Sequence, residues 1–253
     1  MTTDIVQLGI DIGGTGIKGA LVNIVTGELV SERFRLDTPQ PSTPESVAAT
    51  VKEIANQLGW KGPIGCGFPA AIQNGIVLTA ANIDKSWIGV NAEELFSTVL
   101  DNDVYLINDA DAAGVAEMEY GEGKGKKGVV MLFTIGTGIG SALFMDGQLV
   151  PNTELGHLYL KNKLEVVEHY SSGGARKRDG LSWKQWGTRF NRFLSHIQRL
   201  FWPQYIILSG GLSKKYESFS AQLKVTTPVV VAKMRNNAGI IGAAHYAYQK
   251  KNK

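Results

Sequence analysis

A short glycine-rich string occurs twice in the chain, and this repeat restricts the possible folds more than any other feature. The first copy spans residues 14–21 (GTGIKGAL) and the second spans residues 136–143 (GTGIGSAL). Each copy lies between two apolar runs and therefore predicts a strand, a tight turn and a second strand. Because the two copies are separated by about half of the chain, we expect a duplicated domain rather than an array of small repeats.

The repeat divides the chain into two predicted α/β domains, residues 1–120 and residues 121–253. The link at 121–128 is rich in glycine and lysine and lies where the second half would begin. A last helix, at about 237–250, carries small residues that permit close packing. We consider that this helix packs back on the first domain.

Composition and charge narrow the class of protein. The chain is 43% hydrophobic and its 30 glycines fall between apolar runs, so a compact globular protein is expected. A formal net charge of +3 is too small to indicate a nucleic-acid partner. Long apolar runs and a secretion signal are absent from the sequence, so we expect a cytoplasmic protein without a membrane partner. Cys66 is the only cysteine, which excludes an internal disulfide and a cysteine-based metal site.

The first turn has the composition of a phosphate-binding loop. Its three glycines, at 13, 14 and 16, remove the Cβ atoms that would keep a ligand away, so backbone N–H groups could hold an anion. Asp11 lies where a carboxylate could hold Mg²⁺ against phosphate oxygens. The alternative is a glycine hairpin in which Asp11 only caps the turn. The second copy of the string favours the phosphate interpretation.

A buried strand predicted at 104–107 ends in Asn108 and Asp109. In open α/β sheets ligands bind at the carboxyl ends of the strands, so both side chains are candidates for chemistry. The alternative is that Asp109 or Asp111 caps the alanine-rich helix that follows.

Two further groups of polar residues are candidates for ligand contact. Glu154 and His157 flank a glycine in a polar loop and could share one sugar-sized ligand, although two ligands do not make a metal site without a third. Basic residues lie near the predicted turns, where they could bind an anionic polymer or form ordinary solvated surfaces. They are Lys18, Lys85, Arg176, Lys177, Arg178, Lys214 and Lys215.

Together these strings resemble the sugar kinases of the ROK family, which belongs to the actin-like, hexokinase-like superfamily. The resemblance lies in the turn at 11–18, in Asn108-Asp109, in the turn at 136–138 and in the Glu154-x-Gly156-His157 segment. A narrower resemblance is to bacterial polyphosphate glucokinases. It rests on residues 11–20, 38–45, 79–89, 108–117 and 235–244.

The resemblance implies a duplicated actin-like, ribonuclease H-like fold of two domains with an interdomain cleft. It also implies transfer of a phosphoryl group from polyphosphate to the 6-hydroxyl of glucose, with ATP open as a second donor and Mg²⁺ as cofactor. We expect a homodimer. Most ROK kinases carry a zinc-binding cysteine cluster after the Glu-x-Gly-His segment, but residues 158–178 contain no cysteine. Zinc is therefore not expected.

The resemblance assigns roles to individual residues, with Asp109 as the general base. The residues implied in sugar binding are Asn82, Asn108, Asp109, Glu154, His157 and Glu168. The residues implied in binding the phosphate donor are Asp11, Gly13, Gly14, Thr15, Lys18, Thr137 and Gly138. Asp11 would also organise Mg²⁺, directly or through water.

Two alternatives share the predicted fold. The first is an ATP-dependent hexose or N-acetylhexosamine kinase of the same family. The second is a sugar-sensing repressor, which is disfavoured because such repressors carry an N-terminal DNA-binding module, whereas here the phosphate turn begins almost at Met1.

Overall fold

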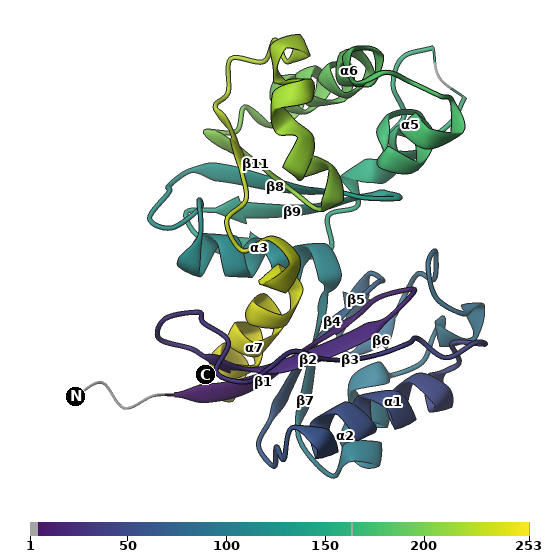
Figure 1. Cartoon of the computed structure of the whole chain (residues 1–253), viewed down its shortest axis with the longest axis vertical. Coiled ribbons are helices and arrows are strands. Elements are labelled where there is room, and N and C mark those ends of the chain that lie inside the picture. The colour runs from purple at the N-terminus through teal and green to yellow at the C-terminus, as the bar shows by residue number, and fades with distance from the viewer. Residues whose placement is uncertain (1–4, 163, 253) are drawn as a thin grey trace. The chain divides into compact units, whose positions relative to one another are not determined.

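The computed structural model describes residues 5–162 and 164–252 of the chain. The chain divides into two compact units: the first comprises the residues up to Tyr120 together with those from Asn237 onward, and the second comprises Gly121–Asn236. Each unit contains one five-stranded sheet with helices packed against it (Figure 1). The predicted α/β class is confirmed.

The sheet of the first unit has the strand order β3-β2-β1-β4-β7. Strand β2 pairs antiparallel with both β1 and β3, whereas β1, β4 and β7 run parallel to one another. These strands are β1 (Val6–Ile12), β2 (Ile17–Asn23), β3 (Phe34–Leu36), β4 (Ile64–Phe68) and β7 (Val104–Asn108). A separate small sheet pairs β5 (Ile72–Gln73) with β6 (Ile76–Val77).

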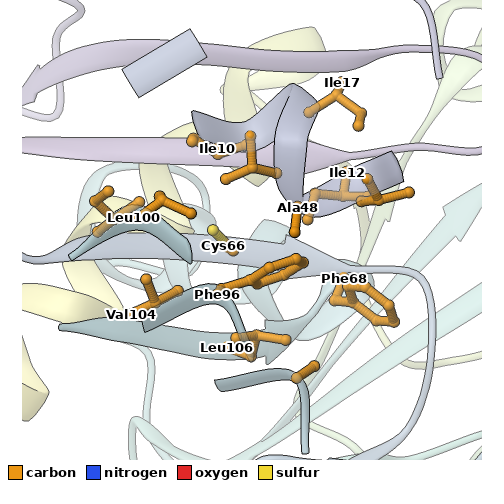
Figure 2. Close-up of a cluster of buried hydrophobic side chains, with 14 of the residues drawn as sticks. Ile10, Ile12, Ile17, Ala48, Cys66, Phe68, Phe96, Leu100, Val104 and Leu106 are labelled. Carbon is orange, nitrogen blue, oxygen red and sulfur yellow. The ribbon is translucent and has the colours of Figure 1, made fainter. Parts of the chain in front are cut away.

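Helices α1 (Pro44–Gln57) and α2 (Ala92–Leu100) bury their apolar side chains against one face of this sheet. Figure 2 shows this core, in which side chains from the strands meet those from both helices. Phe96 of α2, for example, lies near Phe68 of β4, with ring centroids 6.4 Å apart. Burial of this apolar surface is the main favourable contribution to the stability of the unit.

Helix α7 (Ala238–Lys251) lies on the opposite face of the same sheet and also packs against α3 (Asp109–Tyr120). Successive residues of a strand point to opposite faces, and Gly9 and Gly65 are strand positions that face α7. A Cβ atom on either glycine would collide with a backbone carbonyl of this helix. The two glycines therefore allow α7 to lie directly on β1 and β4.

The sheet of the second unit repeats the arrangement of the first, with the order β10-β9-β8-β11-β12. Strand β9 pairs antiparallel with β8 and β10, whereas β8, β11 and β12 run parallel. The strands are β8 (Val129–Ile135), β9 (Ile139–Met145), β10 (Gln148–Val150), β11 (Tyr205–Ser209) and β12 (Val229–Val231). The repeated glycine string therefore marks equivalent hairpins in two sheets of the same order.

The helices of the second unit pack their aromatic side chains on this sheet, where Trp186, Phe190 and Phe193 are fully buried. These helices are α4 (Val167–Ser171), α5 (Gly173–Arg178) and α6 (Trp183–Phe201). The 3₁₀ segments of the chain are η1 (Lys85–Trp87), η2 (Leu155–His157), η3 (Gly211–Ser218), η4 (Ser220–Gln222) and η5 (Arg235–Asn237). Within the described residues, no helix is both long and apolar enough to cross a membrane.

Candidate active site

Residues 13–16 form the turn between β1 and β2, as the glycine string predicts. Ile12 pairs with Ile17 at the end of the ladder, and the N–H of Gly13 donates to the carbonyl of Gly16 at 3.1 Å. Gly14 is exposed at the crest of the turn. The backbone of this crest is therefore open to a ligand.

Neighbouring residues leave little space for a side chain at two of the glycines in this turn. A Cβ atom on Gly14 would lie 3.1 Å from the carbonyl oxygen of Asn82, and one on Gly16 would lie 2.6 Å from Nε of Arg35. The loop that carries Asn82 therefore lies against the turn. The sequence predicted Asn82 as a site residue, but it gave no sign that Arg35 lies beside the turn.

Asp11 and Lys18 face each other across the β1–β2 ladder. The Nζ atom of Lys18 lies 3.5 Å from Oδ2 of Asp11. Burial raises the pKa of Asp11, and the positive charge of Lys18 opposes that rise. The beginning of α7 also approaches this carboxylate, since a Cβ atom on Gly239 would lie 2.9 Å from Cγ of Asp11.

The end of β7 places Asn108 and Asp109 at the start of α3. The side-chain oxygen of Asn108 accepts hydrogen bonds from the N–H groups of Ala110 and Asp111, at 2.9 and 3.1 Å. Its side-chain nitrogen donates to the carbonyl of Ala70 at 3.1 Å. Asn108 is thus a buried helix cap. The sequence offered Asp109 or Asp111 as the cap of α3, whereas the structure has the side chain of Asn108 in that role.

Asp109 is the first residue of α3, and it is exposed. Its Oδ1 atom accepts a hydrogen bond from the N–H of Ala110 at 2.8 Å. A helix N-terminus stabilises a negative charge beside it, so Asp109 lies where a carboxylate is favoured and solvent can reach it. Asp111, one residue further on, is buried.

In the second unit, residues 136–138 form the turn between β8 and β9. Ile135 pairs with Ile139, and the N–H of Gly136 donates to the carbonyl of Gly138 at 3.1 Å. This turn is one residue shorter than the first, and Thr137 is its exposed crest.

Three predicted sugar-binding side chains gather beside this second turn. Oε2 of Glu168 accepts a hydrogen bond from the N–H of Ile139 at 2.8 Å. Nδ1 of His157 lies 3.7 Å from Oε2 of Glu154. Burial raises the pKa of Glu154, with a smaller opposing effect from His157 and a further rise from the negative charge of Glu168. The structure thus brings Glu154, His157 and Glu168 together.

The basic cluster on α5 is largely engaged in contacts within its own unit. Nε of Arg178 lies 2.8 Å from Oδ1 of Asp179, and its Nη2 donates to the carbonyl of His169 at 2.8 Å. The guanidinium of Arg176 lies 3.8 Å from the ring centre of Trp183. Lys177 and Arg178 are exposed, whereas Arg176 is partly buried, so the three residues do not form one uniform basic surface.

The two sheets of equal strand order and their glycine turns define the class of fold, the duplicated hexokinase-like fold. Solved members of this class superpose on nearly the whole chain. One is a ROK family glucokinase from Streptomyces griseus, with a TM-score of 0.82 and 23% identity over 97% of this chain and 100% of that chain. At this level of identity the likeness concerns the fold alone.

Residues 7–177 match the ROK family, and the chain belongs to that family. It is 45% identical to a polyphosphate glucokinase of Mycobacterium tuberculosis over 96% of this chain and 91% of the relative. It is also similar to a solved inorganic polyphosphate/ATP-glucomannokinase from Arthrobacter sp. strain KM, with 46% identity, a TM-score of 0.92 and coverage of 98% and 100%. The predicted family and its narrower resemblance to polyphosphate glucokinases are confirmed.

Proposed function

We propose that the protein is a polyphosphate-dependent glucokinase, which transfers the terminal phosphoryl group of polyphosphate to the 6-hydroxyl of glucose. The observation that carries this proposal is the 45% identity to a polyphosphate glucokinase over 96% of the chain. ATP is proposed as a second donor, because the solved relative from Arthrobacter is named a polyphosphate/ATP enzyme. The same relative is a glucomannokinase, so mannose is the second acceptor to test.

Asp109 is proposed as the general base that takes the proton of the 6-hydroxyl. Its exposed position at the start of α3 supports this role, since a base must reach a bound substrate. Phosphoryl transfer needs little covalent help from a protein, so the side chains that hold the sugar matter as much as the base. These are proposed to be Asn82, Asn108, Glu154, His157 and Glu168.

The two glycine turns are proposed to bind phosphates of the donor through Gly13, Gly14, Thr15 and Lys18 in one unit and Thr137 and Gly138 in the other. Asp11 is proposed to hold Mg²⁺. One carboxylate beside a phosphate turn fits this ion, because Mg²⁺ in kinases is bound by few protein oxygens together with water and substrate phosphates. When bound, the ion would neutralise charge on the donor phosphates. Across residues 5–162 and 164–252, no group of three or more His, Cys, Asp or Glu residues is placed to hold a metal.

The test is to incubate the purified protein with glucose and Mg²⁺ and to measure glucose 6-phosphate with either ATP or long-chain polyphosphate as donor. The Asp109→Asn variant, purified in the same way, controls for a contaminating kinase. Formation of product with polyphosphate would support the proposal. Product with ATP alone, or with an N-acetylhexosamine in place of glucose, would favour the ATP-dependent alternative. Absence of product with every donor would contradict both.

A further inference from the structure

We infer that Thr38 is a positioning residue for the phosphoryl donor: it holds the carbonyl of Gly13 and thereby directs the N–H of Gly14 toward the donor phosphate. This inference rests on the proposed function, because the phosphate of the donor is the ligand concerned. Thr38 lies two residues after β3 and is only 7% exposed. Its hydroxyl donates a hydrogen bond to the carbonyl oxygen of Gly13.

The planarity of the peptide bond connects this hydrogen bond to the ligand. In a trans peptide the carbonyl of one residue and the N–H of the next point in opposite directions. With the Gly13 carbonyl held by Thr38, the N–H of Gly14 must point away from Thr38, and Gly14 is exposed at the crest of the turn. A backbone N–H in that position can donate to an anion.

The glycines explain why the Gly13–Gly14 peptide needs a hydrogen bond that fixes its orientation. The Gly13–Gly14 peptide has no side chain on either flank, so few steric barriers oppose its rotation. A rotated peptide would present the negative end of its carbonyl to a phosphate instead of the N–H. A turn made open by glycines for close approach of a ligand therefore needs an external donor that selects the binding orientation.

Arg35 holds a second carbonyl of the same turn. Its Nη2 donates to the carbonyl of Thr15 at 3.0 Å, and its Nη1 lies 2.8 Å from Oδ1 of Asp37. The ion pair restrains the guanidinium while it makes the backbone contact. Two side chains from one short segment, at 35 and 38, thus hold two of the carbonyls of the first turn.

The second unit holds its own turn in an equivalent way, but with backbone donors. The N–H of Gly173 donates to the carbonyl of Gly136 at 2.9 Å, and the N–H of Gly174 donates to the carbonyl of Thr137 at 3.2 Å. A Cβ atom on Gly173 or Gly174 would collide with the carbonyl that it binds. In both turns the residue directly after the strand therefore has its carbonyl held from outside the hairpin. A held carbonyl thus occurs in both turns although the donors differ, which supports the inference that each turn needs its first peptide fixed in one orientation.

The rival explanation is that the Thr38 hydroxyl only fastens the segment after β3 to the sheet. The two explanations differ in kinetics. A fastener that is lost lowers the unfolding temperature and affects all substrates alike, whereas a lost positioning contact weakens binding of the donor in particular.

The experiment compares Thr38→Val, which removes the hydroxyl at nearly constant volume, with Thr38→Ser, which restores it. The matched control is Thr227→Val, because Thr227 is equally buried and its hydroxyl donates to the carbonyl of Pro203 at 3.0 Å, away from both turns. Removal of one positioned hydrogen bond should raise the donor KM of Thr38→Val about tenfold and change the glucose KM less than about twofold. Thr38→Ser should return the donor KM to near the wild-type value, and Thr227→Val should leave both KM values unchanged.

Binding of tripolyphosphate, measured by calorimetry in the presence of glucose, provides a readout that does not depend on turnover. It should weaken in Thr38→Val by the same factor as the donor KM rises. An active wild type with an unchanged donor KM in Thr38→Val would overturn the inference and leave the proposed function intact. Equal rises in donor and glucose KM, or no rescue by serine, would also overturn it. Lack of phosphorylation by the wild type would instead overturn the proposed function.

Discussion

The carboxylate of Glu168 accepts a hydrogen bond from the N–H of Ile139, the first residue of β9, with 2.8 Å between Oε2 and the nitrogen. The same carboxylate occupies the space where a side chain on Gly138 would lie. A residue that the family resemblance assigns to the sugar is therefore also an anchor of the second glycine turn. The side chain of Glu168 therefore links the two functions proposed for this unit, which are binding of the sugar and binding of the donor phosphate.

Replacement of Glu168 should separate these two functions. Glu168→Gln keeps an oxygen that can accept from Ile139 but loses the charge, so we expect a glucose KM about tenfold higher with a nearly unchanged donor KM. Glu168→Ala removes the acceptor as well, so both KM values should rise and the thermal unfolding temperature should fall. Steady-state kinetics with each substrate varied in turn would measure this. A Glu168→Ala variant with the wild-type donor KM would show that the turn does not depend on this anchor.

Loss of the carboxylate at position 109 should stop catalysis without stopping sugar binding. For Asp109→Asn we expect turnover to fall by at least about 10²-fold, as is typical for loss of a general base, while glucose still binds. Asp146→Asn is the matched control, because Asp146 is also exposed and also accepts a backbone N–H, that of Gly128 at 2.8 Å. Near-normal turnover in Asp109→Asn would refute the assignment and direct attention to Asp111.

Local sequence signals were sufficient for the hairpins and for the strand that ends at Asn108. Glycines between apolar runs restrict the backbone of the turns strongly, and a buried strand followed by polar residues predicts a sheet edge. The sequence offered Asp109 or Asp111 as the cap of α3, and residue types alone could not show that Asn108 takes this position, since Asn and Asp are both good caps. In the folded chain the side-chain nitrogen of Asn108 also donates to the carbonyl of Ala70, which holds the side chain in the capping position.

Contacts between distant segments were beyond the reach of the sequence. Thr38 and Arg35 lie 20 or more positions from the turn carbonyls that they hold, and the residue types alone do not reveal which carbonyl they bind. The sequence also could not show which charges of the basic run at 176–178 are paired. Its charges look alike in the sequence, but only the folded chain shows that Arg178 is paired with Asp179.

This difference within the basic residues leads to a prediction about the polymer. Lys214 and Lys215 are exposed on η3, which follows β11 at the same sheet edge as the second glycine turn. We expect the double variant Lys214→Ala/Lys215→Ala to lower kcat/KM for long polyphosphate more than for ATP. Because each lost phosphate contact reduces counterion release, the log–log salt dependence of kcat/KM should become shallower by about one to two units when both lysines are removed.

The control for this prediction is Arg178→Ala. Its guanidinium is bound to Asp179 and to the carbonyl of His169, so its loss should lower the unfolding temperature and affect both donors equally. Equal effects of the lysine pair on both donors, or no effect on the salt dependence, would place the polymer elsewhere.

His245 of α7, which contacts Tyr120 at the end of α3, gives a prediction about stability. The hydroxyl of Tyr120 donates to the carbonyl of Ile24 at 2.6 Å and lies 2.6 Å from Nδ1 of His245. Since the tyrosine proton is used for Ile24, Nδ1 of His245 must carry a proton, and Nε2 is then the acceptor for the side-chain nitrogen of Gln249 at 2.9 Å. The contacts are satisfied by the neutral ring.

Burial lowers the pKa of His245 below the ordinary value of 6.5, and Glu119, whose Oε1 lies 3.7 Å from Nε2, opposes this only in part. As pH falls below 6.5, the unfolded chain therefore takes up a proton at this residue before the folded chain does. The unfolded state binds more protons in this range, so the free energy of unfolding must decrease with falling pH. Well above pH 6.5 both states are neutral at this residue, and its contribution to stability does not change with pH.

We therefore expect the unfolding temperature of the wild type to fall between pH 7 and about pH 5.5, within the range where histidine titrates. His245→Gln should be less stable than the wild type at pH 7, because it loses the buried contact to Tyr120, but its unfolding temperature should fall less over the same interval. His196→Gln, which replaces a half-buried histidine of α6 in the other unit, is the control that shows how much of a change in slope follows from the loss of any histidine. Calorimetry at several pH values measures all three proteins. Parallel curves for the wild type and His245→Gln would mean that His245 does not carry this pH dependence, since linkage requires its removal to change the slope as well as the height of the curve.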